Sequence, residues 1–335
     1  MKKPKAVIAT MFLFVVLIIV SALFYHYKFG ADIIVIRNIK IGSPPLARSP
    51  YGMAVSKNND IYVAVGGFNN VIELSNSGKY TKSLAADWAP SGVVIGRNGN
   101  IYVTTGSGYL IKFSKSGKFL KQVFTGITSS GIAIGPDGNI YVAPIHAGHI
   151  VKLSRSLKIL KVFPAGKSTY TVALNKSGDI YVANFLKKGT ITELSPQGKI
   201  ISVFKAGNKP EGMAIGKKGN IYVTTYYTDE VMKFTKNGKF IGKVYLKGNP
   251  YSIALSTTGT MFIACINSNY VYKLNRRGKI LNKFKTGKWP NYVAIDKTGN
   301  VWVSDAGSAE VTEIKNITKG RQFFPYKGPV WETSF

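Results

Sequence analysis

The chain has 335 residues and a formal charge of +30, from 45 Lys and Arg against 15 Asp and Glu. Its hydrophobic fraction of 45% is ample for a folded core and excludes a mostly disordered chain. One cysteine, Cys265, excludes an intrachain disulfide framework, and three histidines provide little material for a His-rich metal centre.

The first thirty residues form a segment apart from the predicted fold. A basic head, residues 1–5, precedes twenty uncharged residues, Ala6 to Tyr25. As a helix this run would be about 30 Å long, the thickness of bilayer hydrocarbon. Because positive residues stay on the cytoplasmic side, we expect a single-pass membrane protein with residues 31–335 outside the cytoplasm. The alternative is a signal peptide, cleaved near Val20-Ser21-Ala22, and a secreted protein.

The rest of the chain repeats one pattern seven times. An apolar segment with a central aromatic residue recurs at spacings of 40, 39, 40, 41, 40 and 40 residues. A second apolar stretch precedes it across a turn rich in Gly and Asn, and two further short stretches follow. The segments are Ile61–Val63, Ile101–Val103, Ile140–Val142, Ile180–Val182, Ile221–Val223, Met261–Ile263 and Val301–Val303.

Four short antiparallel strands in about forty residues are the unit of a propeller blade, and a ring of blades buries each sheet face against a neighbour. The sequence therefore predicts one all-β domain over residues 31–335, a seven-bladed β-propeller of four-stranded antiparallel blades. The aromatic residues should pack between blades. A linear solenoid is the alternative, but it would need polar end repeats, and the end repeats resemble the middle ones. Ile33 to Ile41 and Pro329 to Phe335 predict extra strands, one or both beside the last blade.

At this point a family resemblance emerges. The pattern Pro-x-Gly-hydrophobic-Ala-hydrophobic, then Gly-Asn-hydrophobic-aromatic-Val, resembles the NHL repeat from Pro50 to the C-terminus, and residues 190–200 are similar to virginiamycin B lyase-like propellers. The resemblance implies ligand or partner binding, with lyase- or lactonase-like activity in some relatives that would need metal ligands at the channel mouth. No lyase His/Glu set matches here, so none is carried over. The acid that many NHL repeats place two residues after the aromatic–Val pair is present only as Asp305; the other six positions hold Val65, Thr105, Pro144, Asn184, Thr225 and Cys265.

The candidate ligand site is the top of the central channel. In a propeller the first strand of each blade lines the channel, and loops from strand four to one and from strand two to three crowd the top face. The alternative is that the rim side chains only surround water. No catalytic residue, metal ligand or cofactor is assigned. The ligand-binding residues predicted on this basis are Tyr51, Tyr170, Glu211, Tyr251, Asn291 and Asp305.

Basic residues recur in the turns of the opposite, bottom face. We expect these turns to bind an anionic polymer or lipid surface through many weak contacts. A solubilising turn composition is the alternative. Charge alone would also allow nucleic acid, but export disfavours it. The residues predicted to carry this binding are Lys118, Lys199, Lys239 and Lys279.

Two functions compete on this evidence. The main expectation is an exported, membrane-anchored binding or scaffolding module whose partner is a protein, a polysaccharide or an anionic surface. The alternative is a lyase- or lactonase-like enzyme with its site at the top of the channel. A divalent metal held by three or more top-face side chains would favour the enzyme.

Overall fold

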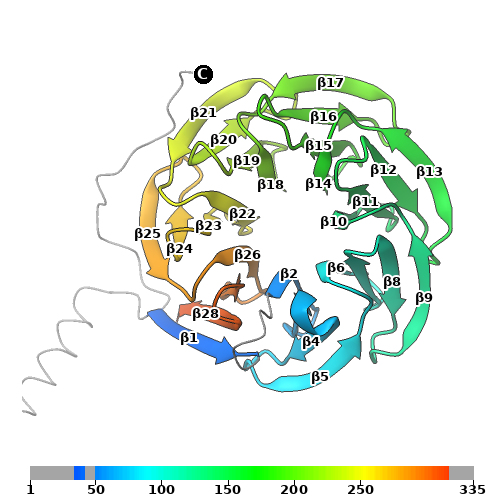
Figure 1. Ribbon diagram of the computed structural model, residues 1–335. Coiled ribbons are helices and arrows are strands. Elements are labelled where there is room, and N and C mark those ends of the chain that lie inside the picture. Colours follow the sequence, from blue (N-terminus) through cyan, green and yellow to red (C-terminus); the bar gives the residue numbers. More distant parts are fainter. Residues whose placement is uncertain (1–33, 42–49, 317–335) are drawn as a thin grey trace, which may run out of the picture.

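The computed structural model describes residues 34–41 and 50–316, which form seven four-stranded antiparallel sheets arranged in a ring (Figure 1). The predicted all-β, seven-bladed propeller is thus confirmed. No helix within these ranges is long and apolar enough to cross a membrane. The predicted anchor or signal peptide, Ala6 to Tyr25, and the predicted strand Pro329 to Phe335 lie outside the described residues.

Each blade places its first strand at the channel and its fourth strand at the rim of the ring (Figure 1). The first strands are β2 (Pro50–Val55), β6 (Pro90–Ile95), β10 (Ser129–Ile134), β14 (Thr169–Leu174), β18 (Pro210–Ile215), β22 (Pro250–Leu255) and β26 (Pro290–Ile295). The second strands are β3 (Ile61–Val65), β7 (Ile101–Thr105), β11 (Ile140–Pro144), β15 (Ile180–Asn184), β19 (Ile221–Thr225), β23 (Met261–Cys265) and β27 (Val301–Asp305). The third strands are β4 (Asn70–Leu74), β8 (Tyr109–Phe113), β12 (His149–Leu153), β16 (Thr190–Leu194), β20 (Glu230–Phe234), β24 (Tyr270–Leu274) and β28 (Glu310–Asn316). The fourth strands are β5 (Tyr80–Ala85), β9 (Phe119–Phe124), β13 (Ile159–Pro164), β17 (Ile200–Lys205), β21 (Phe240–Tyr245), β25 (Ile280–Lys285) and, from the N-terminal side, β1 (Ile34–Lys40).

Tight turns at the bottom of each blade depend on glycine. Gly117, between β8 and β9, has a φ of +92°, a left-handed conformation that side chains with a Cβ rarely adopt. A Cβ at this position would also clash with Leu84 of the preceding blade. The turn glycine therefore serves both the hairpin and the packing between neighbouring blades.

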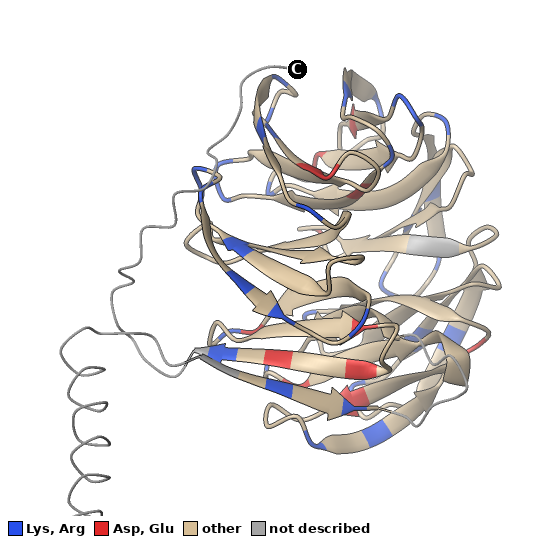
Figure 2. Ribbon diagram, turned by 60° about the vertical axis from the view of Figure 1, so that its left-hand side comes forward, with Lys and Arg blue, Asp and Glu red and all other residues tan. Residues whose placement is uncertain are grey.

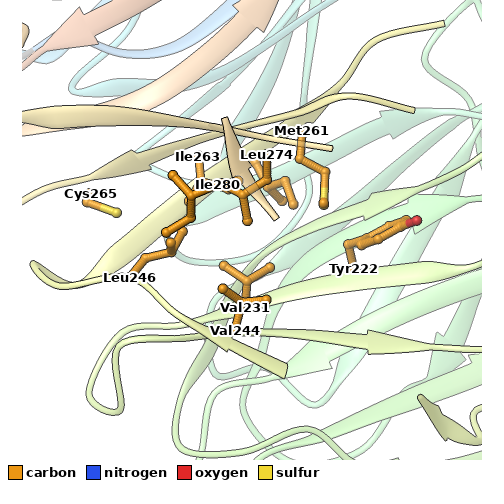
Figure 3. Packing of buried hydrophobic residues seen from close by; sticks show 10 residues of the cluster. Tyr222, Val231, Val244, Leu246, Met261, Ile263, Cys265, Leu274 and Ile280 are labelled. Atoms are coloured by element: carbon orange, nitrogen blue, oxygen red, sulfur yellow. The ribbon is translucent and has the colours of Figure 1, made fainter. Parts of the chain in front are cut away.

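The core lies at the boundaries between blades. Every residue of each second strand is buried, and the aromatic residue at its second position packs into a cluster shared with the next blade. Figure 3 shows the cluster that Tyr222 of blade 5 shares with Met261 and Ile280 of blade 6. The buried polar ends of these aromatics are satisfied, as where the Trp302 indole donates to Asp296 (3.1 Å). The predicted interblade role of the aromatic residues follows directly from these clusters.

The ring closes through the N-terminal strand. β1 pairs with β28 from Ile34 opposite Asn316 to Lys40 opposite Glu310, so the seventh blade is completed by a strand from the other end of the chain. The Arg37 guanidinium lies 2.6 Å from Glu313 Oε2 in β28 and donates to the Ser77 carbonyl of blade 1 (2.6 Å). The prediction of a fourth-type strand near residues 33–41 is confirmed.

Candidate functional site

A pocket of about 150 Å³ occupies the top end of the channel. It is lined by the second and third residues of the first strands, which come together from all seven blades because each first strand enters the channel from the top. The volume is well below the range of roughly 300–1,000 Å³ for drug-sized ligands, so the pocket admits one group of a larger molecule. Five of the six predicted ligand residues line it: Tyr51, Tyr170, Glu211, Tyr251 and Asn291.

The wall of the pocket is built from closely approaching backbones. A Cβ on Gly212 would clash with the Tyr251 carbonyl of the next blade, and one on Gly131 would lie 2.6 Å from the Tyr170 carbonyl. Glycine at the third position therefore lets adjacent first strands approach each other. The functional groups of the pocket come from the side chains at the second position of each first strand, which differ from blade to blade.

Glu211 is the acidic residue among those that line this pocket. Pro210 pairs with Thr225 and Met213 with Val223, so Glu211 and Gly212 lie in a β-bulge, which directs the Glu211 side chain into the channel. The residue is 5% exposed, and its Oε2 meets no hydrogen-bond donor within the described part of the chain. Burial raises the pKa of Glu211 to about 8, although hydrogen bonds from Tyr251 and Tyr170 and the charge of Lys209 oppose the shift.

Two tyrosines hold this carboxyl group in place. The hydroxyls of Tyr170 and Tyr251 lie 2.8 Å apart, and each hydroxyl interacts with the Glu211 carboxyl group through a hydrogen bond and through its charge. Burial, then the neighbouring charge, raises the pKa of both hydroxyls, so both stay protonated and able to donate. Phe185 stacks on Tyr170 with ring centroids 4.8 Å apart, and Tyr226 meets Tyr251 edge-on at 6.2 Å. The aromatic neighbours restrict the rings that orient the carboxyl group.

Sequence reasoning missed this supporting layer. The Lys209 ammonium lies 5.0 Å from the Phe185 ring and 4.4 Å from the Tyr227 ring, and it is the cation that lowers the pKa of Glu211. Phe185, Tyr226 and Tyr227 follow directly after second strands β15 and β19, at the start of top loops. Aromatic residues at that position in two adjacent blades were a signal that could have found them.

Further apolar side chains extend the mouth of the channel. Trp88 and Trp289 stand in the loops that precede β6 and β26 and are 62% and 57% exposed, and Ile127 before β10 is 76% exposed. A Cβ on Gly307 would approach Trp289 Cδ2 to 2.7 Å, so the indole lies flat on a glycine backbone. These top-face residues give a bulky apolar molecule a surface outside the small pocket.

Asn291 and Tyr51 share one hydrogen-bond partner. The Ser304 hydroxyl lies 2.6 Å from Asn291 Oδ1 and 2.7 Å from the Tyr51 carbonyl, which fixes both first strands at the channel. Asp305, the sixth predicted residue, does not line the pocket, because its side chain turns from β27 toward Thr312 in β28 (2.5 Å). Burial raises the pKa of Asp305 to about 7, while hydrogen bonds from Thr312, Thr286 and the Gly287 amide oppose the shift.

The donor atoms of the mouth do not fit the metal site that the family resemblance implies. In residues 34–41 and 50–316 no three or more His, Cys, Asp and Glu side chains come together as a possible metal site. Glu211 stands beside phenols, which are weak ligands for hard divalent cations while protonated. His146 lies on the top face against Ser168 and Phe185, outside the pocket lining.

The predicted anionic-surface residues lie far from the channel, in the bottom turns. We use this term for the turns between first and second strands and between third and fourth strands; they carry 17 Lys and Arg against four acids, Asp60, Asp137, Asp179 and Asp296. Figure 2 shows the excess of basic residues over the ribbon. Lys118, Lys199 and Lys239 are exposed and Lys279 is half-buried, each in a different blade. They are spread around the ring rather than gathered at one point.

Comparison with solved structures gives the same architecture. A streptogramin B lyase matches with a TM-score of 0.76 and 15% identity, covering 85% of this chain and 98% of that one. A virginiamycin B lyase from Staphylococcus aureus matches with a TM-score of 0.75, and its catalytically inactive histidine-to-alanine variant with quinupristin with 0.76, both at 15% identity over 85% of this chain and 100% of theirs. No family model and no curated sequence matches the chain. At this identity the likeness establishes the fold, and it confirms the resemblance to virginiamycin B lyase-like propellers at that level.

The comparison corrects the main functional expectation. A binding or scaffolding module was expected because the repeats resemble the NHL pattern, but the three solved structures named above are lyases, which are enzymes. The module interpretation is therefore wrong as the main interpretation, and the findings favour its alternative. The physical reason for the error is that repeat patterns report the packing between blades, which binding and catalytic propellers share.

Proposed function

We propose that this chain is a lyase- or lactonase-type enzyme that opens a cyclic ester at the top of its channel. The observation that carries the proposal is Glu211, a carboxyl group buried in the pocket with a pKa of about 8 and one oxygen facing no donor among the described residues. The fold likeness to streptogramin B lyase supports the class of reaction.

Glu211 is the proton acceptor in this proposal. In an elimination, the carboxylate takes a proton from the carbon next to the ester C–O bond, a C=C bond forms, and the ester carboxylate leaves with the C–O electron pair. In a hydrolysis, the carboxylate takes a proton from water as the water oxygen attacks the carbonyl carbon. The acyl C–O bond of the tetrahedral intermediate then breaks, and the protonated Glu211 returns the proton to the leaving alkoxide. A buried carboxylate with a raised pKa is a stronger base than an exposed one, which suits both steps.

The other residues orient the base and the substrate. Hydrogen bonds with Tyr170 and Tyr251 orient the Glu211 carboxyl group, and its Oε2, which meets no donor among the described residues, is the oxygen available to the substrate. The pocket receives the reacting part, and the apolar top-face residues Trp88 and Trp289 hold the remainder. One matched lyase is inactive when a histidine is changed to alanine. The proposed reaction of this chain assigns no role to a histidine, because neither His146 nor His149 lines the pocket.

The decisive experiment is mass analysis of reaction products. The full chain is incubated with quinupristin and with a panel of macrocyclic and small lactones. Elimination gives a ring-opened product of unchanged mass, while hydrolysis adds one water. We expect Glu211→Gln to lower the rate by about 10²–10⁴-fold, and the wild-type rate to rise with pH until about 8, because the base must be ionised.

Asp305→Asn is the matched control. Asp305 is also buried with a raised pKa, yet it lies outside the pocket, so its removal should leave the rate nearly unchanged. A chain that opens none of these esters, or a folded Glu211→Gln variant with the full rate, would contradict the proposal.

We also propose that the propeller is held at a membrane outside the cytoplasm. The support is the basic head and the apolar run Ala6 to Tyr25. Protease added to spheroplasts should digest the propeller, and full protection would refute this location.

A further inference from the structure

A groove in the bottom face between blades 5 and 6 gathers positive charge. It has a volume of about 860 Å³ and is formed by the turn before β19, strand β20 and the two bottom turns of blade 6. Its lining includes three hydroxyl residues, Ser256, Thr257 and Thr258, and no acidic residue. Its cations are Lys217, Lys218, Lys233, Arg276 and Arg277.

The arrangement concentrates these charges. Lys233 lies 5.5 Å from the Tyr222 ring and donates to the Arg276 carbonyl (3.1 Å), which fixes the ammonium at the base of the groove. Burial and the charge of Arg276 lower the pKa of Lys233, as expected where cations crowd together. Lys217, Lys218, Arg276 and Arg277 are exposed around it. A bound anion would offset this repulsion.

The equivalent groove between blades 1 and 2 is different. It has a volume of about 330 Å³ and contains Lys57, Lys82, Arg97 and Lys115, but also two acids, Asp60 and Glu73. Glu73 Oε2 lies 3.0 Å from Lys82 Nζ. At the matching positions, before the second strand and opposite its aromatic residue, blade 5 has Asn220 and Lys233. The groove between blades 5 and 6 therefore contains more basic residues than the groove between blades 1 and 2, and no acidic residue offsets them. Blade 2 repeats part of the arrangement, since Lys112 lies opposite Tyr102 and donates to the Arg155 carbonyl (2.8 Å), but the groove there is only about 20 Å³.

The path of the chain places this groove near the proposed membrane segment. Ile34 opposite Asn316 marks the bottom end of blade 7, since β28 runs from the top loop to the bottom. The eight residues between Tyr25 and Ile34 can span at most about 28 Å. Blade 6 is a direct neighbour of blade 7, so the groove opens on the face from which the N-terminal segment departs and lies one blade away from its exit.

We propose that the groove between blades 5 and 6 binds the phosphate headgroups of anionic lipids and so seats the bottom face of the propeller on the membrane. Guanidinium groups and hydroxyls donate hydrogen bonds to phosphate oxygens. Each cation near an anionic surface contributes on the order of 1 kcal/mol to the free energy of binding. The channel mouth then faces away from the bilayer. This inference concerns a different site from the proposed enzyme activity and stands or falls independently of it.

The test uses the full chain in neutral detergent micelles, where the apolar segment is already covered. Dihexanoyl-phosphatidylglycerol, dihexanoyl-phosphatidylcholine and inorganic phosphate are titrated separately by calorimetry at low salt. We expect phosphatidylglycerol to bind, phosphatidylcholine not to bind, and phosphate to bind at least tenfold more weakly than phosphatidylglycerol. The triple change Lys217→Gln, Arg276→Gln, Arg277→Gln should weaken phosphatidylglycerol binding at least tenfold, and Asn220→Asp alone about fivefold.

The matched control is Lys57→Gln, Arg97→Gln, Lys115→Gln, which removes the same number of charges from the groove between blades 1 and 2. It should change phosphatidylglycerol affinity less than twofold. Equal losses in the two triple variants would show a diffuse charge effect and overturn the site. Equal binding of phosphatidylcholine, or phosphate binding as tight as phosphatidylglycerol, would overturn the lipid assignment.

Discussion

The second strands and the first strands of the blades differ in how much their residues vary from one blade to another. In every second strand all five residues are buried, and the second residue is aromatic in all seven blades. The second residues of the first strands share no such pattern and include Tyr, Ser, Glu and Asn. The difference teaches that packing between blades keeps the repeats uniform, while the channel wall is held by its backbone and leaves side chains available for chemistry.

The largest effect should come from breaking the uniform part. Tyr181 is 1% exposed in the cluster with blade 5, and its hydroxyl lies 3.0 Å from Glu193 Oε1 and 3.1 Å from the Lys236 carbonyl oxygen. We expect Tyr181→Ala to lower the free energy of unfolding by about 3–5 kcal/mol, measured by urea denaturation. Tyr51→Ala, at a channel position, should cost under about 1 kcal/mol. Similar losses in both variants would remove the contrast.

The pH dependence of stability should isolate the channel acid. The pKa of Glu211 rises from 4.5 to about 8 on folding, so the folded state holds the proton more tightly. Its stabilisation is complete below about pH 4.5 and is lost as the pH rises toward 8, at up to roughly 1.4 kcal/mol per pH unit. Urea unfolding of wild type and Glu211→Gln across this range should show a difference that grows with pH in favour of the variant. Asp305 titrates in both proteins, so its contribution cancels in the difference between them. Parallel curves of unfolding free energy against pH would contradict the assignment of Glu211 as a buried acid.

Ring closure offers a test of intermediate size. Removing Arg37 leaves Glu313, which is buried, without its ion-pair partner. We expect Arg37→Met to cost about 1–3 kcal/mol in urea unfolding. The double variant Arg37→Met, Glu313→Gln should recover part of that loss, whereas additive losses would show that the two residues do not act together.

The smallest effect should appear in the bottom turns. Changing Lys118, Lys199, Lys239 and Lys279 to Gln should alter the free energy of unfolding by less than about 0.5 kcal/mol per site, because charges in exposed turns contribute little. The same variant, titrated against phosphatidylglycerol at low and high salt, would show how much of the lipid affinity comes from the whole ring. A loss larger than that of the groove variant would favour the diffuse interpretation.

The sequence predicted the fold because its repeat has the alternation and the turn residues of short antiparallel strands. It also predicted that Tyr170, Glu211 and Tyr251 lie at the channel rim, since propeller topology alone brings the first strands together, but it did not predict their mutual contacts. It misplaced Asp305, because the strand pleat, which decides which way a side chain turns, is not visible in a spacing. It missed Phe185 because the path of a loop cannot be read from residue spacing. It missed the basic groove because the groove is formed by turns that lie nearly sixty residues apart in the sequence and come together only in the folded ring.

The β1–β28 pairing has a consequence for the order of events during biosynthesis. Of the strands in residues 34–41 and 50–316, β1 is the first that the ribosome makes and β28 is the last, so β1 must wait without its partner while six complete blades emerge. Blades 1 to 6 pair local strands and can form as they are made, whereas the seventh needs the two ends of the domain. The pocket is lined by Tyr51 of blade 1 and Asn291 of blade 7, which lie on either side of the boundary where the ring closes. A truncated or stalled chain would therefore contain most of the propeller and none of its finished channel mouth.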